Sequence, residues 1–116
     1  MAKIIEKPWG SEEILLQTNE FVVKRILVKA HHRLSLQFHR VKIESWLVLR
    51  GRGLYVSAKG EDSYNGKFVD SIPANAIHRL EAYEDTEIIE VSTPELDDVV
   101  RVEDDYGRVD KCCGEG

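Results

Sequence analysis

Four side chains that can bind a divalent metal ion occur in two segments of the sequence. Gln37, His39 and Glu44 fall within residues 34–53, and His78 follows much later in the chain. Imidazole nitrogen, carboxylate oxygen and amide oxygen together form a ligand set suited to Zn, Mn, Fe, Co or Ni. Such a set leaves coordination positions open for water or a substrate. The four residues therefore predict a metal site of the catalytic kind.

These side chains can converge if the segments that carry them are β-strands. Residues two apart in a strand share a face, so Arg33, Gln37 and His39 are expected to point to one side. Glu44 shares a face with Trp46 in the next apolar run. The short link between the two strands allows Glu44 to lie near His39. We therefore expect one polar wall built from two neighbouring strands.

Apolar runs with strand-forming residues recur along the chain at short intervals. The predicted strands are EEILLQ (12–17), EFVVKRILVKA (20–30), RLSLQFH (33–39), SWLVLRG (45–51), GLYVSAK (53–59), KFVDSI (67–72), HRLEAYE (78–84) and TEIIEVST (86–93). Turn-forming residues such as Asn65-Gly66 and Pro73 separate them. Only residues 94–102 have a pattern that could hold a helical turn. The sequence therefore predicts an all-β jelly roll or small barrel with little or no helix.

Size, charge and cysteine content restrict the class of protein. A chain of 116 residues fits one domain, and a net charge of -5 argues against nucleic acid as the main partner. The absence of a long apolar run and of a signal-peptide pattern predicts a cytoplasmic protein without membrane contact. Cys112 and Cys113 are adjacent and lack metal or redox spacing. We expect one domain over residues 1–108 and a flexible tail over 109–116.

The spacing of the polar residues resembles the two motifs of the cupin superfamily, which implies a double-stranded β-helix. The first motif is Gln37-x-His39-x4-Glu44-x6-Gly51, and the second is Pro73-x-Asn75-x2-His78. The chain more closely resembles the cupin domain of type II mannose-6-phosphate isomerases, which is often fused to a mannose-1-phosphate guanylyltransferase. The resembling segments are KPWGSEE (7–13), VKRILVKA (23–30), RLSLQFH (33–39), ESWLVLRG (44–51), IPANAIHRLE (72–81), IIEV (88–91) and DDVVRVEDDYGR (97–108). The glycine-rich nucleotide loop of the fused enzymes has no counterpart here, so we expect the isomerase domain alone.

Four positions depart from the family pattern. Val41 stands where that family usually has a second histidine, His31 and Asn75 replace motif glycines, and Ala82 replaces an asparagine. The remaining Gln, His, Glu and His resemble the zinc ligands of type I mannose-6-phosphate isomerases, which implies that Gln37 is a ligand. Alternatively, Gln37 bonds the backbone, and the metal binds weakly through the other three groups.

The resemblance implies interconversion of mannose 6-phosphate and fructose 6-phosphate through an enediol. This reaction needs a metal to polarise oxygens, a base near the two carbons and cations for the phosphate. Glu90, a carboxylate inside an apolar strand, is the candidate base, with a structural ion pair as the alternative. The candidate substrate-binding residues are Arg33, Lys24, Trp46 and Arg108, with Arg33 also a candidate catalytic residue. Arg79 alternates with His78 and is expected in a surface or salt-bridged role.

Two other functions remain open at this stage. One is a noncatalytic cupin that binds a sugar phosphate, which the loss of a histidine at Val41 favours. The other is a different metal-dependent cupin enzyme. The expected cofactor is one divalent ion, with Zn first and Mn, Co, Ni or Fe as alternatives. Exposed sheet edges favour a homodimer as the assembly.

Overall fold

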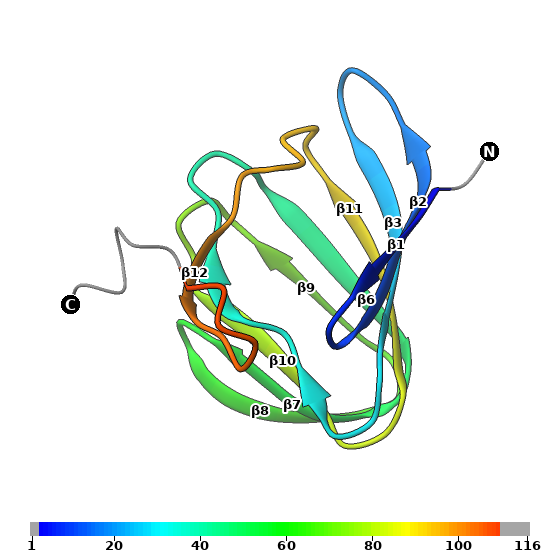
Figure 1. Ribbon diagram of the computed structural model, residues 1–116, viewed down its shortest axis with the longest axis vertical. Helices are drawn as coiled ribbons and strands as arrows, with labels where there is room; N and C mark the ends of the chain where they lie inside the picture. The colour runs from blue at the N-terminus through cyan, green and yellow to red at the C-terminus, as the bar shows by residue number, and fades with distance from the viewer. Residues whose placement is uncertain (1–2, 110–116) are drawn as a thin grey trace.

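The computed structural model describes residues 3–109, and their regular structure consists of β-strands (Figure 1). The strands are β1 (Lys3–Lys7), β2 (Gly10–Gln17), β3 (Val22–Val28), β4 (His32–Arg33), β5 (Leu36–Phe38), β6 (Glu44–Arg50), β7 (Arg52–Ser57), β8 (Gly60–Asn65), β9 (Phe68–Ile72), β10 (His78–Ala82), β11 (Thr86–Ser92) and β12 (Val100–Glu103). These residues contain no helix, and so none that could cross a membrane. The all-β expectation is confirmed.

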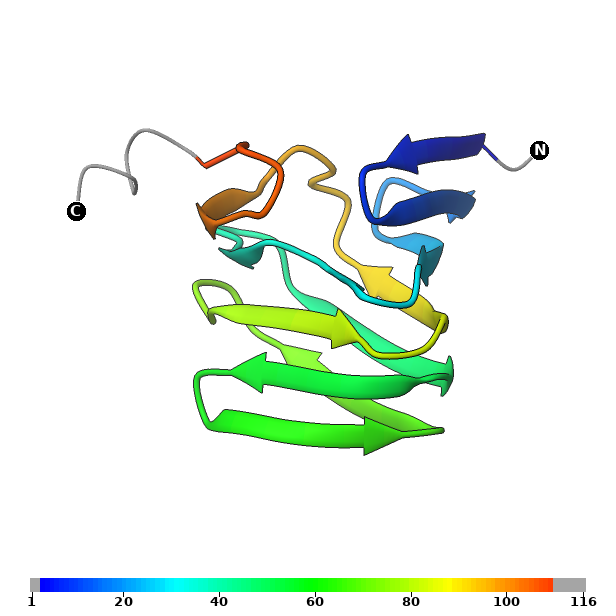
Figure 2. The ribbon, with the colours of Figure 1, turned by 60° about the horizontal axis from the view of Figure 1, so that its bottom comes forward.

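Two antiparallel sheets face each other around a common interior (Figure 2). The first sheet has the order β1-β2-β3-β11-β6-β9. The second has the order β12-β5-β10-β7-β8, and β4 also pairs with β10. Strands that are distant in sequence become neighbours in this arrangement, as β3 does with β11 and β5 with β10. The jelly-roll topology thus brings His78 of β10 directly opposite Gln37 of β5.

The barrel interior is apolar over most of its depth. Alternate residues of the central strands point inward, as the burial pattern of β3 shows at every second position. The apolar core consists of Trp9, Ile26, Val28, Leu34, Trp46, Val48, Tyr55, Tyr64, Ile72, Leu80, Ala82 and Ile88. Leu80, Val48 and Ile88 are completely buried. This packing fixes the strands whose ends carry the polar residues.

A polar layer lies next to the apolar core across the first sheet. Lys24 of β3 pairs with Glu90 of β11, which in turn pairs with Trp46 of β6. Ser92 and Glu44 face each other at the next inward position. All five residues are buried. The inward face of these strands is apolar along one part of their length and charged along the other. The interior therefore has an apolar part and a polar part.

The strands predicted from the sequence do not include β1, β8 or β12, and they do not include the break between β4 and β5. The edge strands β1 and β8 are missed because they bury few residues: β1 has no buried residue, and β8 has only Tyr64. Residues 94–102 contain a turn at residues 96–97 and the start of β12, and no helix. The run predicted over residues 33–39 is interrupted between Arg33 and Leu36. The tail cysteines Cys112 and Cys113 lie outside the described residues.

Two positions that depart from the cupin motifs have unusual backbone geometry. His31 and Asn75 both have φ of 67°, the left-handed region that glycine adopts most readily. A glycine at the corresponding motif positions would adopt this conformation without strain from a Cβ atom. The turn geometry of the motifs is therefore retained in this chain although the glycines are not.

Candidate metal centre and cavity

His39, Glu44 and His78 converge in the buried interior. His39 directly follows β5, Glu44 begins β6 and His78 begins β10. Glu44 Oε1 lies 3.2 Å from His39 Nε2 and 2.9 Å from His78 Nε2. The possible ligand atoms of the three residues lie within 4.8 Å of one another. The jelly roll therefore assembles two imidazoles and one carboxylate from β6, β10 and the residue that follows β5.

Backbone carbonyls fix the orientation of both imidazole rings. His39 Nδ1 donates to the carbonyl of Asp98, and His78 Nδ1 donates to the carbonyl of Ala76 at 3.0 Å. This arrangement leaves Nε2 of each ring as the atom that can bind a metal, and both Nε2 atoms face Glu44. A carbonyl that holds the second ring nitrogen is the usual support of a metal-binding histidine.

The electrostatics of the triad fit a cation. Burial opposes ionisation of Glu44, but hydrogen bonding to His39 and His78 and the charge of Lys42 outweigh it and lower the pKa of Glu44. His78 Nε2 and Glu44 Oε2 are buried and have no hydrogen-bond partner, although His78 Nε2 lies 2.9 Å from Glu44 Oε1 and Glu44 Oε2 lies 3.3 Å from Lys42 Nζ. A divalent ion bound by His78 Nε2 and the Glu44 carboxylate would satisfy the imidazole nitrogen.

Gln37 lies beside this triad. It lines the same cavity as His39 and Glu44, and it pairs with His78 across β5 and β10. Its amide nitrogen donates to the carbonyl of Ser35 at 3.4 Å, a bond that does not use the amide oxygen. This bond to the backbone is the one that the alternative interpretation expects, and a role of the Gln37 amide oxygen as a fourth metal ligand stays a prediction.

A second carboxylate, Glu90, faces the triad from β11. Its Oε1 accepts a hydrogen bond from Trp46 Nε1 at 3.0 Å, and its Oε2 lies 3.8 Å from Lys42 Nζ. Burial and the nearby charge of Glu44 raise the pKa of Glu90 to about 7, while the charge of Lys42 acts in the opposite direction. A carboxyl group with this pKa can both take up and release a proton near neutral pH.

Lys42 is a site residue that the sequence interpretation did not single out. Its ammonium lies 3.3 Å from Glu44 Oε2 and bridges the two carboxylates of the centre. Although burial opposes its charge, the carboxylates of Glu90 and Glu44 raise the pKa of Lys42. Lys42, Glu44 and Trp46 are two apart in sequence, so the alternation that placed Glu44 could also have found Lys42.

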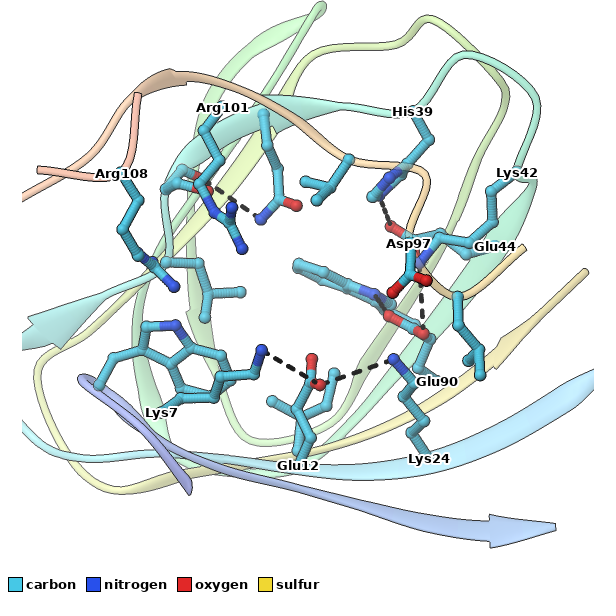
Figure 3. A pocket seen from close by; sticks show the side chains of 18 residues that line it. Lys7, Glu12, Lys24, His39, Lys42, Glu44, Glu90, Asp97, Arg101 and Arg108 are labelled. Atoms are coloured by element: carbon cyan, nitrogen blue, oxygen red, sulfur yellow. Dashed lines mark hydrogen bonds and ion pairs between the residues drawn. The ribbon is translucent and has the colours of Figure 1, made fainter. Parts of the chain in front are cut away.

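His39, Glu44 and Glu90 border a cavity of about 340 Å³, whereas His78 is not among its lining residues (Figure 3). Its ionisable lining residues are Lys7, Glu12, Lys24, His39, Lys42, Glu44, Glu90, Asp97, Arg101 and Arg108. Lys24 and Lys7 lie 3.6 Å and 3.8 Å from Glu12 Oε2. Trp46 and Trp9 supply aromatic surface. The sequence interpretation did not single out Lys7, Glu12 or Asp97 as site residues.

Arg33 lies outside the lining of this cavity, in contrast to its expected place on the face of Gln37. Its guanidinium donates two hydrogen bonds of 2.7 Å to Asp105. The reason is the break between β4 and β5, which interrupts the alternation so that Leu34 and Ser35 line the cavity instead. We therefore do not assign Arg33 a role in catalysis or substrate binding.

Two further residues, Val41 and Arg79, have side chains that take no part in the metal centre. Val41 is 61% exposed and does not line the cavity, so its side chain takes no part in the triad. Arg79 points away from the metal centre, donating to the carbonyl of Leu34 and to Glu103. Its expected salt-bridged role is confirmed, although the side chain is buried rather than on the surface.

The fold and the buried triad define the chain as a cupin. A cupin-2 domain protein from Rhodospirillum rubrum has a TM-score of 0.74 and 15% identity, covering 84% of this chain and 73% of that chain. Capsular polysaccharide assembling protein CapF from Staphylococcus aureus has a TM-score of 0.73 and 19% identity, covering 90% and 32%. At these identities the likeness shows the fold alone, and it confirms the double-stranded β-helix.

Residues 1–104 match the family described as "Mannose-6-phosphate isomerase C-terminal", and the chain belongs to this family. Mannose-1-phosphate guanylyltransferase ManC from Salmonella typhimurium is 38% identical over 115 residues, which cover 94% of this chain and 24% of that protein. The mannose-1-phosphate guanylyltransferase of Escherichia coli is 34% identical over 110 residues, covering 90% and 23%. The chain thus spans about a quarter of the length of these relatives.

Proposed function

We propose that the chain is a metal-dependent mannose-6-phosphate isomerase domain that interconverts mannose 6-phosphate and fructose 6-phosphate. The observation that carries this proposal is the division of one cavity into two ends. Figure 3 shows His39, Glu44 and Glu90 on one side, and Arg101 and Arg108 on the opposite side. A hexose phosphate has the same polarity, with its carbonyl and phosphate at opposite ends. The family membership of residues 1–104 supports the same substrate.

The metal ligands in this proposal are Gln37, His39, Glu44 and His78. Zinc is the first choice because two imidazoles, a carboxylate and an amide oxygen suit it, and Mn, Co, Ni and Fe are alternatives. When bound, the ion would act as a Lewis acid on the substrate oxygens at C1 and C2. The backbone carbonyls of Asp98 and Ala76 keep the two imidazoles in place.

Glu90 performs the proton transfer between the two carbons. Its carboxylate takes the proton from C2 of the open-chain aldose, which gives the enediol, and returns it to C1 to give the ketose. A second proton moves from O2 to O1, so the reaction is balanced without another reactant. The pKa of Glu90, about 7, suits both steps. Trp46 Nε1 fixes the carboxylate through Oε1 and leaves Oε2 for the proton.

A coupled assay that detects fructose 6-phosphate tests this function. Protein loaded with zinc or manganese is expected to form fructose 6-phosphate, and Glu90→Gln should lower kcat by roughly 10²–10⁴-fold. Gln37→Ala and His78→Ala are expected to lose bound metal together with activity. Val41→Ala is the matched control, because Val41 lies in the loop that follows β5, near Gln37 in sequence, but outside the cavity. Full activity in both ligand variants would reject the assigned site.

A noncatalytic function is the alternative outcome. If the metal-loaded protein binds mannose 6-phosphate but forms no fructose 6-phosphate, the domain is a sugar-phosphate-binding cupin. Isothermal titration calorimetry with mannose 6-phosphate, run on the samples used in the assay, separates this case from an empty or misfolded site. Metal content measured on the same samples excludes loss of the ion as the cause.

A further inference from the structure

The outer faces of the two sheets differ in composition. An antiparallel sheet with one face on the core and the other in water normally alternates apolar inward residues with polar outward ones. The second sheet follows this rule, since Glu61 and Ser63 of β8 and Glu81 of β10 lie on its outer side. By contrast, the large apolar side chains that are exposed within the described strands all belong to the first sheet, and they are Ile4, Leu15, Leu16, Leu47, Val69 and Val91. Apolar residues on both faces are typical of a sheet that is covered on both faces.

The strand register brings several of these side chains together. Ile89 of β11 pairs with Leu47 of β6, which pairs with Val69 of β9. Val91 of β11 pairs with Val23 of β3. Each of the five alternates with less exposed neighbours in its strand, so their side chains point away from the barrel interior. These five residues form a continuous apolar area across four strands, which we call the outer patch.

The outer patch has an uncharged centre and a border of paired charges. Ser45 and Ser71 lie beside it on β6 and β9, and their hydroxyls hydrogen-bond to each other at 3.1 Å. The bordering charges form one network, in which Glu87 accepts hydrogen bonds from Arg25 and from Arg50. An apolar centre with a polar rim is the usual anatomy of a protein interface. Because the rim charges are already paired, covering the patch leaves none of these three without a partner.

The first sheet is large enough for a stable contact between two proteins. The strands β2, β3, β11, β6 and β9 lie side by side and contain five to eight residues each. At about 4.8 Å between strands and about 3.4 Å per residue, this face covers roughly 500–600 Å². Two such faces in contact would bury roughly 1,000–1,200 Å² in total, which reaches the size of a specific interface.

We infer that the outer patch is the interface of a homodimer in which the first sheets of two copies pack face to face. A second copy is the matching occupant, because the uncharged patch does not select an oppositely charged partner and the same surface on another copy is equally apolar. A two-fold axis brings Leu47 and Val69 of each copy onto the apolar surface of the other, with the strands of the two sheets roughly aligned. The homodimer expected from the sequence then uses a sheet face rather than the sheet edges.

The cavity with the metal triad is compatible with this assembly. Glu44, Trp46 and Glu90 line the cavity from the inner face of β6 and β11. Leu47 and Ile89 of the same two strands point to the opposite side of the sheet. Contact through the outer patch therefore leaves the cavity unobstructed, and the inference depends neither on a bound metal nor on the sugar.

Sedimentation equilibrium of the full chain over a range of micromolar concentrations tests the inference. We expect the wild type to have twice the mass of one chain. Leu47→Lys should raise the dissociation constant at least about 100-fold, because two ammonium groups would be buried without partners. Val69→Thr is a milder change that should still fold, and it should raise the constant about tenfold because a hydroxyl replaces a buried methyl group in each copy. Circular dichroism checks the folding of each variant, and Val69→Thr decides if Leu47→Lys does not fold.

Val56→Lys is the matched control on the other sheet. Val56 of β7 pairs with Glu61 of β8 on the outer side of the second sheet, so we expect this variant to remain a dimer. Equal weakening of the dimer in Val56→Lys and Leu47→Lys would mean that any lysine on a sheet face has this effect, and it would refute the inference.

Two other results would overturn the inference. A wild type that is monomeric at every concentration would exclude a second copy and leave a different protein as the occupant of the outer patch. A dimer that resists both Leu47→Lys and Val69→Thr would place the contact elsewhere, such as at the sheet edges. A dimer that responds as expected in a protein that forms no fructose 6-phosphate would keep this inference and reject the proposed function.

Discussion

Asp98 connects the loop that carries His39 to the segment between β11 and β12, and its replacement should destabilise the metal centre. Its Oδ1 accepts a hydrogen bond from the N–H of Arg40 at 3.0 Å. Its Oδ2 accepts bonds from the N–H groups of Val41 at 2.7 Å and Lys42 at 2.8 Å. One carboxylate thus organises the three residues that directly follow His39.

The cost of Asp98→Ala can be estimated from these three bonds. Lys42 is buried, so its unpaired N–H would cost about 1–3 kcal/mol, whereas water can replace the bonds to the exposed Arg40 and Val41 at about 0.5–1 kcal/mol each. We expect the free energy of unfolding to fall by about 2–5 kcal/mol in total. Urea denaturation at pH 7 measures this change.

A pH series gives a second test of the same carboxylate. Burial opposes the charge of Asp98, but the three backbone N–H groups outweigh it and lower its pKa in the folded state. The stability that Asp98 supplies is therefore present above its unfolded pKa and is lost as pH falls through the lower folded pKa. The difference between wild type and Asp98→Ala should shrink in that acidic range. The neighbouring Asp97→Ala is the control, and an equally small effect at pH 7 in both variants would refute the reasoning.

Four further predictions concern the core, a turn and the proposed base. Leu80→Ala should lower the free energy of unfolding by about 2–5 kcal/mol, because Leu80 is completely buried; thermal denaturation measures this. His31→Gly should raise that free energy by about 0.5 kcal/mol, since glycine relieves the left-handed strain at a smaller entropic cost; a clear loss in urea denaturation would contradict this. The kcat/KM for mannose 6-phosphate should fall below a pH of about 7, because Glu90 must be ionised to act as a base. Trp46→Phe removes a hydrogen bond to the Glu90 carboxylate, so its pKa should rise and the acidic limb of the pH profile should move to higher pH.

The inward-facing strand residues could be predicted from the sequence because alternation in a strand is a local property. Glu44 and Trp46 do point inward together, and their buried positions follow from the apolar neighbours of β6. The family resemblance supplied the distant partner His78, which local patterns could not join to β5. The expected metal identity and the homodimer stay predictions.

The parts that sequence patterns missed depend on interruptions and on long-range charge pairing. The break after Arg33 reverses the expected face, and Ser35 alone, between Leu34 and Leu36, is too weak a turn signal to mark it. Glu12 and Lys7 reach the cavity only because β1 and β2 extend the first sheet over its opening. The polar strand β8 lacks the apolar alternation on which strand prediction depends.

Isomerisation in heavy water shows whether Glu90 moves a proton between C2 and C1 of the sugar. Metal-loaded protein is incubated with mannose 6-phosphate in D₂O, and the sugar is followed by NMR spectroscopy. We expect fructose 6-phosphate to appear with deuterium at C1, and Glu90→Gln to suppress both signals while keeping bound metal. Mannose 6-phosphate that binds at full metal occupancy but forms no fructose 6-phosphate and gains no deuterium would show that the domain is not an isomerase.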